Sequence, residues 1–340
     1  MSPPSRRPSD AELVTALHDL GPNAPAWQKT FGCPRPTAYR WIKRAKELAP
    51  EPQTAVPGPD DMDLTHLIPS PNPKQVSRRV YKLVTDLLPT GTPIILVGGA
   101  GSGKTEIPRQ IAAERHLPHV RVDCNGSIEF DQVIGRWSFD RRTPIFSKSD
   151  FLKALLQPSV VSLDEVSTVD PINWTGPLNM LLDSRTVSVR QEGRTYRLHA
   201  GVLLFLAANP PSDGYQVNEV STALMNRPYC CFVPPFSRDE IHEYLCANYP
   251  ELISDVGDNL VKFYDEMQRA RTEQHKHFEF SIRNISKFAE AWRIFHDVRV
   301  ALRLAFLNSV LLTDDLETMD GCCGIATSVF GLDFGGCGEE

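Results

Sequence analysis

Residues Gly98-Gly99-Ala100-Gly101-Ser102-Gly103-Lys104-Thr105 form the most informative stretch of this chain. They match the pattern G-x-x-x-x-G-K-[ST], whose glycines let backbone N–H groups close around phosphate oxygens. An apolar segment, residues 93–97, precedes the stretch, and a helical pattern from Glu106 to about Arg115 follows it. A strand–loop–helix order is the context in which this pattern binds nucleotides, and the helix N-terminus adds a positive dipole. The stretch therefore predicts a nucleotide-binding α/β fold.

The loop also predicts individual contacts. Lys104 has the length and charge to reach the β- and γ-phosphates, and the Thr105 hydroxyl can hold Mg²⁺. A dinucleotide-binding fingerprint is disfavoured, because Lys104 and Thr105 stand where its last glycine would be. We expect the nucleotide to contact Gly98, Gly99, Ala100, Gly101, Ser102, Gly103, Lys104, Thr105 and Glu106.

Two further apolar segments end in polar residues. Residues 160–163 lead into Asp164 and Glu165, and residues 202–207 lead to Asn209. Asp164 is a candidate Mg²⁺ ligand and nucleotide contact, and Glu165 is a candidate for polarising the water that attacks a γ-phosphate. We expect Asn209 to lie beside the acids and to hydrogen-bond that water or the phosphate.

This set of motifs, followed by residues 221–227 (Ser-Thr-Ala-Leu-Met-Asn-Arg), resembles the AAA+ ATPases. The most similar branch is the MoxR and dynein-related group, which includes the McrB-type motors. The resemblance covers residues from about 75 to 300. It implies ATP and Mg²⁺ as ligands, a five-stranded parallel sheet of order 5-1-4-3-2, a helical lid, and a homo-oligomeric ring, usually a hexamer.

Three family features transfer onto matching residues. Arg227 resembles the arginine finger that reaches the γ-phosphate of a neighbouring subunit, and Arg283 resembles the lid arginine called sensor 2. Residues 185–198 alternate around a glycine-containing turn, which predicts a β-hairpin. This hairpin resembles the helix-2 insertion of the branch, and Arg185 is a candidate for the subunit interface.

Patterning and composition divide the chain into five parts. Strands are predicted at 93–97, 119–123, 159–163, 202–207 and 229–233, separated by helices, as in a parallel sheet covered on both faces. We expect a small all-α module over 1–48, a proline-rich linker over 49–73, the α/β core over 74–236, a helical lid over 237–330 and a disordered tail over 331–340.

The N-terminal module is basic and helical. Residues 1–50 carry a net charge of +4, whereas the rest of the chain carries −10. A helix is predicted after Asp10 as N-cap, another over 25–31, and a third over 35–48 with Ala38, Ile42 and Ala45 on its inner face. Residues 32–44 resemble the recognition segment of helix-turn-helix DNA-binding domains. The candidate DNA contacts are Arg35, Thr37, Arg40, Lys43 and Arg44.

The composition of the 340 residues is that of a globular protein. No apolar run approaches a membrane span, and the first residues lack a hydrophobic signal core, so we expect a cytoplasmic protein without a membrane partner.

Three functions fit these features. The leading interpretation is an AAA+ ATPase ring that binds DNA and couples Mg·ATP hydrolysis to its remodelling or translocation. One alternative is a MoxR-like chaperone that remodels a protein partner. Another is an ATP-controlled DNA-binding regulator or a transposition-type target selector.

Overall fold

The computed structural model describes residues 8–9, 12–13, 16, 24–48, 62–71, 76–124, 128–140, 143–210, 226–274, 278–311 and 316–335. The chain divides into two compact units, each considered by itself below. One unit comprises residues 1–56 with 194–197, and the other comprises residues 57–193 and 198–340.

A five-stranded sheet forms the centre of the larger unit. All of its neighbouring strands pair in parallel, in the order β2-β5-β8-β1-β9. The strands are β1 (Ile94–Val97), β2 (His119–Asp123), β5 (Ser159–Asp164), β8 (Val202–Ala208) and β9 (Tyr229–Phe232). Counted along the chain as five core strands, this order reads 5-1-4-3-2 from the β9 edge, which confirms the predicted sheet.

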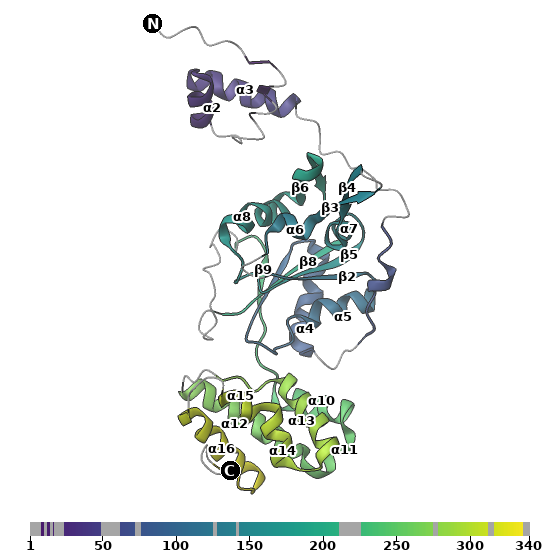
Figure 1. The fold of residues 1–340 in the computed structure, drawn as a ribbon, viewed down its shortest axis with the longest axis vertical. Helices are drawn as coiled ribbons and strands as arrows, with labels where there is room; N and C mark the ends of the chain where they lie inside the picture. The colour runs from purple at the N-terminus through teal and green to yellow at the C-terminus, as the bar shows by residue number, and fades with distance from the viewer. Residues whose placement is uncertain are drawn as a thin grey trace. The chain divides into compact units, whose positions relative to one another are not determined.

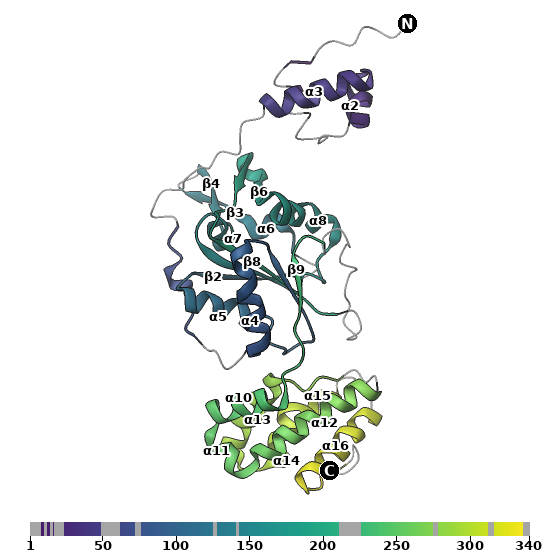
Figure 2. The ribbon, with the colours of Figure 1, turned by 180° about the vertical axis from the view of Figure 1, so that it is seen from behind.

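Helices cover both faces of the sheet (Figures 1 and 2). One face carries α4 (Arg78–Leu87) and α5 (Glu106–Arg115), and the other carries α6 (Phe130–Ile134), α7 (Asp150–Leu155) and α8 (Pro171–Asn179). Short 3₁₀ turns, η2 (Thr65–Leu67) and η4 (Leu88–Thr90), precede and follow α4. Val84 and Ile107 pack with Ile94 in a buried cluster between the helices and the strands. Burial of these apolar faces fixes the sheet that carries the site.

Two β-hairpins project from the core. The first pairs β3 (Gly135–Asp140) with β4 (Thr143–Lys148), between α6 and α7. The second pairs β6 (Thr186–Val189) with β7 (Arg194–Arg197); between them lie the turn η6 (Arg190–Glu192) and Gly193, which has a φ of 62°. A π-helical turn, η5 (Met180–Ser184), links α8 to β6.

The predicted hairpin at 185–198 is therefore confirmed, and it lies between α8 and β8. Its likeness to the helix-2 insertion stays a prediction. The β3–β4 hairpin was not predicted, because the sequence between its strands contains none of the glycine or asparagine signals of a tight turn.

The second half of the larger unit is helical. Its elements are α10 (Arg238–Asn248), α11 (Pro250–Leu252), η8 (Ile253–Gly257), α12 (Asp258–Gln274), α13 (Ile282–Phe295), α14 (Val298–Leu302), η9 (Arg303–Leu307), α15 (Asn308–Val310) and α16 (Leu316–Phe330). Phe263, Phe280 and Phe306 meet edge to face at its centre. The sequence predicts a disordered tail from residue 331, but Phe334 is buried in this core and its carbonyl accepts a hydrogen bond from Arg303.

The smaller unit contains α2 (Ala24–Phe31) and α3 (Arg35–Leu48). Ala38, Ile42 and Ala45 are buried, as predicted for the inner face of α3. The predicted N-cap, Asp10, lies outside the described residues, but Ser9 and Glu12 beside it form a reciprocal pair of contacts. The Ser9 hydroxyl accepts from the Glu12 N–H, and the Glu12 carboxylate accepts from the Ser9 N–H. This reciprocal capping box is readable as S-x-x-E in the sequence.

Within the part of the chain that the structure describes, no helix combines the length and hydrophobicity needed to cross a lipid bilayer.

Candidate nucleotide-binding site

The phosphate loop connects β1 to α5, as its pattern predicts. Gly101 and Gly103 have φ values of 71° and 91°, in the left-handed region that glycine adopts at little cost. Lys104 is buried, and its ammonium group donates to the carbonyls of Gly98, at 2.7 Å, and Gly99, at 2.5 Å. The loop thus folds around its own lysine, with α5 starting immediately beyond it.

Asp164 lies at the carboxyl end of β5 and is only 3% exposed. Its Oδ2 accepts a hydrogen bond from the Thr105 hydroxyl at 3.0 Å, which joins two motifs 59 residues apart in sequence. The Arg121 Nε lies 2.8 Å from the same oxygen. Burial raises the pKa of the Asp164 carboxyl above its usual value, against the opposing effects of Arg121 and Thr105.

This geometry is suitable for a hard divalent cation. Mg²⁺ prefers oxygen ligands and is commonly held by one or two protein oxygens together with phosphates. Thr105 and Asp164 present two such oxygens side by side. The other carboxylate oxygen, Asp164 Oδ1, is buried and has no hydrogen-bond partner among the residues that the structure describes. Since a buried carboxylate oxygen normally has a partner, Oδ1 is available as a metal ligand.

Glu165 adopts a φ of 58°, which is uncommon for a residue with a side chain. Its carbonyl accepts from both the N–H and the hydroxyl of Thr168, each at 2.9 Å, and the next N–H, of Val166, donates to Ala207 of β8. Strained backbone of this kind persists where the surroundings enforce it, often at functional sites. The turn separates the Glu165 side chain from the strand and places it in the same cavity as Lys104.

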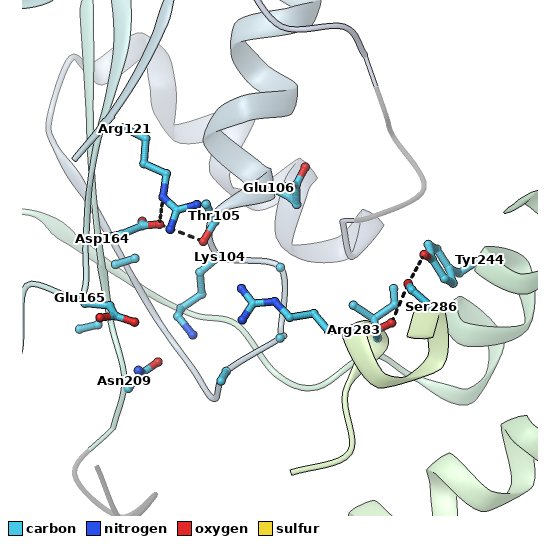
Figure 3. Close-up of a pocket in the computed structure, with 16 residues that line it drawn as sticks. Lys104, Thr105, Glu106, Arg121, Asp164, Glu165, Asn209, Tyr244, Arg283 and Ser286 are labelled. Carbon is cyan, nitrogen blue, oxygen red and sulfur yellow. Dashed lines mark hydrogen bonds and ion pairs between the residues drawn. The ribbon is translucent and has the colours of Figure 1, made fainter. Parts of the chain in front are cut away.

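One cavity contains most of the predicted site (Figure 3). Arg283 extends from the lid toward the phosphate loop, whereas Glu165 and Asn209 lie on the strand side. The cavity is lined by Ala100, Gly101, Gly103, Lys104, Thr105, Glu106, Arg121, Asp164, Glu165, Ala207, Ala208, Asn209, Tyr244, Ile282, Arg283 and Ser286.

Helix α13 brings the lid to this cavity. Ser281 is its N-cap and forms a capping box with Asn284. A Cβ on Gly101 would collide with the Ser281 side chain, so this contact depends on glycine in the loop. Ile282, Arg283 and Ser286, from the first turns of α13, line the cavity.

Five residues that the sequence assigns to the nucleotide site or the subunit interface lie outside the lining of the cavity. Gly98 and Gly99 accept from Lys104, and the Ser102 hydroxyl donates to the Gly99 carbonyl, so these three shape the loop. Arg227 pairs instead with Asp183 of η5, with Nε 2.6 Å from the carboxylate. Arg185 also has a structural contact, because its guanidinium donates to the Val202 carbonyl.

Arg121, Tyr244 and Ser286 also line the cavity, although they are not among the site residues predicted from the sequence. Arg121 had a signal, because His119, Arg121 and Asp123 alternate along β2 and place three polar side chains on one face of a strand. Tyr244 and Ser286 are joined by a 2.7 Å hydrogen bond between α10 and α13, and nothing local in the sequence pairs them.

The predicted DNA contacts lie on α3 of the smaller unit. Arg40, Lys43 and Arg44 are exposed, and Thr37 is half-buried. The Arg35 side chain is outside the described part of the chain. The three exposed cations leave one side of α3 strongly basic.

The chain is similar in sequence to several known proteins. Midasin from Dictyostelium discoideum is 24% identical over 213 residues, covering 58% of this chain but only 4% of midasin. Protein NorQ from Paracoccus denitrificans (strain Pd 1222) is 23% identical over 241 residues, covering 70% of this chain and 87% of NorQ. The denitrification regulatory protein NirQ from Stutzerimonas stutzeri is 23% identical over 126 residues, covering 37% of this chain and 45% of NirQ.

A family model, the AAA domain of the dynein-related subfamily, matches residues 93–227. This range contains the phosphate loop, Asp164, Glu165 and Asn209, and it ends at Arg227. Residues 93–227 are therefore similar to AAA domains of the dynein-related subfamily, and the larger unit has the P-loop fold of the AAA+ ATPases.

Proposed function

We propose that the chain is an Mg²⁺-dependent ATPase that works as an oligomeric ring and couples ATP hydrolysis to the remodelling or translocation of DNA. The observation that carries the ATPase proposal is the convergence of Lys104, Glu165 and Arg283 on one cavity beside Thr105 and Asp164. These side chains come from the phosphate loop, the sheet edge and the lid.

Each side chain has a role that its position supports. Lys104 leaves the loop carbonyls to bind phosphate oxygens, and Arg283 offers a second cation from the lid side of the cavity. Thr105 and Asp164 would hold Mg²⁺, which when bound screens the phosphate charge and orients the γ-phosphate. Glu165 accepts a hydrogen bond from the attacking water and withdraws its proton, while Asn209 orients that water or the phosphate.

The ring proposal rests on Arg227. Phosphoryl transfer develops charge that an arginine can stabilise from a neighbouring subunit. Arg227 is absent from the lining of its own chain's cavity and pairs with Asp183, so a role at a γ-phosphate would be one toward another copy of the chain. A homo-hexamer is the assembly that the family resemblance implies.

The DNA proposal rests on α3. Its exposed Arg40, Lys43 and Arg44 suit contacts with phosphates and with guanine edges in a major groove. A single module with so few cations would bind weakly and with strong salt dependence, and a ring would raise the affinity through avidity.

Steady-state ATP hydrolysis with and without duplex DNA tests this function. We expect DNA to stimulate hydrolysis at low salt, and the stimulation to disappear when Arg40 and Arg44 are both replaced by alanine. Lys29→Ala, which removes an exposed cation from α2, is the matched control and should retain the stimulation. ATPase activity that ignores DNA in every variant would reject the DNA proposal and favour a protein partner, as in the MoxR-like chaperone alternative.

A further inference from the structure

Arg121 occupies an unusual position for a basic residue. It lies within β2, with its guanidinium paired to two carboxylates, Asp164 on β5 and Asp123 on its own strand. Asp164 is the acid that the nucleotide site assigns to the metal. Figure 3 shows the Arg121 guanidinium beside both Asp164 and Thr105. A guanidinium cation is thus already in contact with Oδ2 of the proposed metal ligand Asp164.

From this contact we infer that Arg121 is a positioning residue that prevents Asp164 from binding a divalent cation until the nucleotide arrives. The inference rests on the proposed function, because it assigns Asp164 to Mg·ATP. Like charges repel each other at close range. A divalent ion that binds Asp164 must therefore either tolerate repulsion by the guanidinium or displace it.

The surroundings of Arg121 leave space into which its guanidinium group can move. Its side chain is 45% exposed and lines the same cavity as Lys104. Phosphate oxygens in that cavity are an alternative anionic partner, and planar guanidinium groups bind them well. A bare metal ion brings no such partner, whereas a metal–nucleotide complex does. Metal binding at Asp164 therefore becomes conditional on the nucleotide.

The same contact explains how an apo site tolerates a buried carboxylate. Asp164 is almost fully buried, and a buried charge requires a compensating partner. Arg121 supplies that partner on Oδ2, together with the Thr105 hydroxyl, and leaves Oδ1 uncommitted. The arrangement offsets part of the cost of burying Asp164 and fixes the orientation of its carboxyl group through Oδ2.

The test uses Mn²⁺ alone as a probe on the full-length, nucleotide-free protein, followed by electron paramagnetic resonance. We expect weak binding by the wild type and binding at least about tenfold tighter by Arg121→Gln, because a competing cation is removed. Arg109→Gln is the matched control. Arg109 is a partly exposed arginine on α5 that pairs with Glu106 rather than with Asp164, and its variant should bind Mn²⁺ like the wild type.

A second variant covers the case in which Arg121→Gln does not fold. Arg121→Lys keeps the charge but lacks the planar donors that contact both carboxylates. It should bind Mn²⁺ at least about threefold more tightly than the wild type, because a single ammonium group cannot hold both carboxylates and is displaced from Asp164 more easily. Folded variants that bind Mn²⁺ no more tightly than the wild type would overturn the inference. Arg121 would then have only a structural role, as the partner of Asp164 and Asp123 in ion pairs.

Adding ATP to the Mn²⁺ titration separates this inference from the proposed function. Tight Mn·ATP binding by the wild type without tighter binding of Mn²⁺ alone by the Arg121 variants rejects only the masking role. A wild type that binds Mn²⁺ no better with ATP than without it rejects the assignment of Asp164 to the metal–nucleotide complex, and the inference fails with it.

Discussion

Arg227 and Asp183 form an ion pair within one chain, with the arginine Nε 2.6 Å from the carboxylate. Both side chains are partly exposed, so the pair itself contributes little to folding stability. The pair holds the guanidinium at the end of η5, immediately before the edge strand β9. An arginine in such a weak pair can exchange its partner when a second subunit arrives.

Mixing two inactive variants tests whether Arg227 acts between subunits. We expect Arg227→Ala to lower the rate of ATP hydrolysis by about 10³-fold or more while leaving ATP binding intact. Mixed with Glu165→Gln, it should recover part of the wild-type rate, because the second variant supplies an intact arginine to the first variant's intact site. Asp183→Asn should lower the rate of ATP hydrolysis only a few-fold. No recovery on mixing would contradict a role in trans.

The contact between Gly101 and Ser281 predicts an effect of a single methyl group. Gly101→Ala adds a Cβ at a φ of 71°, against the N-cap of α13. We expect it to destabilise the site by about 1–3 kcal/mol through backbone strain alone, and to weaken ATP binding. ATP affinity measured by calorimetry checks this.

Gly176→Ala is the matched control for that change. Gly176 lies within α8, and a Cβ there would meet no atom within 4 Å. Because alanine is the better helix former by about 1 kcal/mol, this variant should be neutral or stabilised. Equal losses of ATP affinity in both variants would show that the Ser281 contact is irrelevant.

A partly buried histidine predicts a pH dependence of stability. Burial, reinforced by Arg109 and Arg121, lowers the pKa of His119 to about 4, and the ring pairs with the Ser162 hydroxyl at 2.9 Å. Unfolded chains therefore bind more protons than folded ones between about pH 6.5 and pH 4, so stability falls as the pH falls through that window and is constant above it.

Urea unfolding at pH 7.5 and at pH 4.5 measures this effect. The lowered pKa of His119 corresponds to a loss of about 3 kcal/mol at most in the free energy of unfolding across the full window. His119→Gln, which cannot take up that proton, should lose less stability between the two pH values than the wild type. Parallel losses in the two proteins would mean that other groups account for the acid sensitivity.

Much of the core was predictable from local patterns. The phosphate loop, the β2 boundaries and α5 follow from periodicity and glycine spacing, and Asp164 follows from its place at the end of an apolar strand. These features are encoded within a few residues of each other. The same holds for α3, whose buried Ala38 and exposed Arg40 follow the helical period.

The features that were missed depend on distant residues. The pairing of Arg121 with Asp164 requires the register of β2 against β5, and the Tyr244–Ser286 bond requires the packing of α10 against α13. The β3–β4 hairpin carries no turn signal at its tip. Burial of Phe334 depends on the cluster formed by α12, η9 and α16, which a glycine-rich tail does not reveal.

The central claim is that this cavity hydrolyses Mg·ATP with Glu165 as the group that activates water. The most direct measurement is the single-turnover hydrolysis of ATP by the wild type and by Glu165→Gln, with ATP binding measured on the same preparations. The account predicts that the variant binds ATP as tightly as the wild type and hydrolyses it at least about 10²-fold more slowly. Equal hydrolysis rates in the two proteins would contradict it.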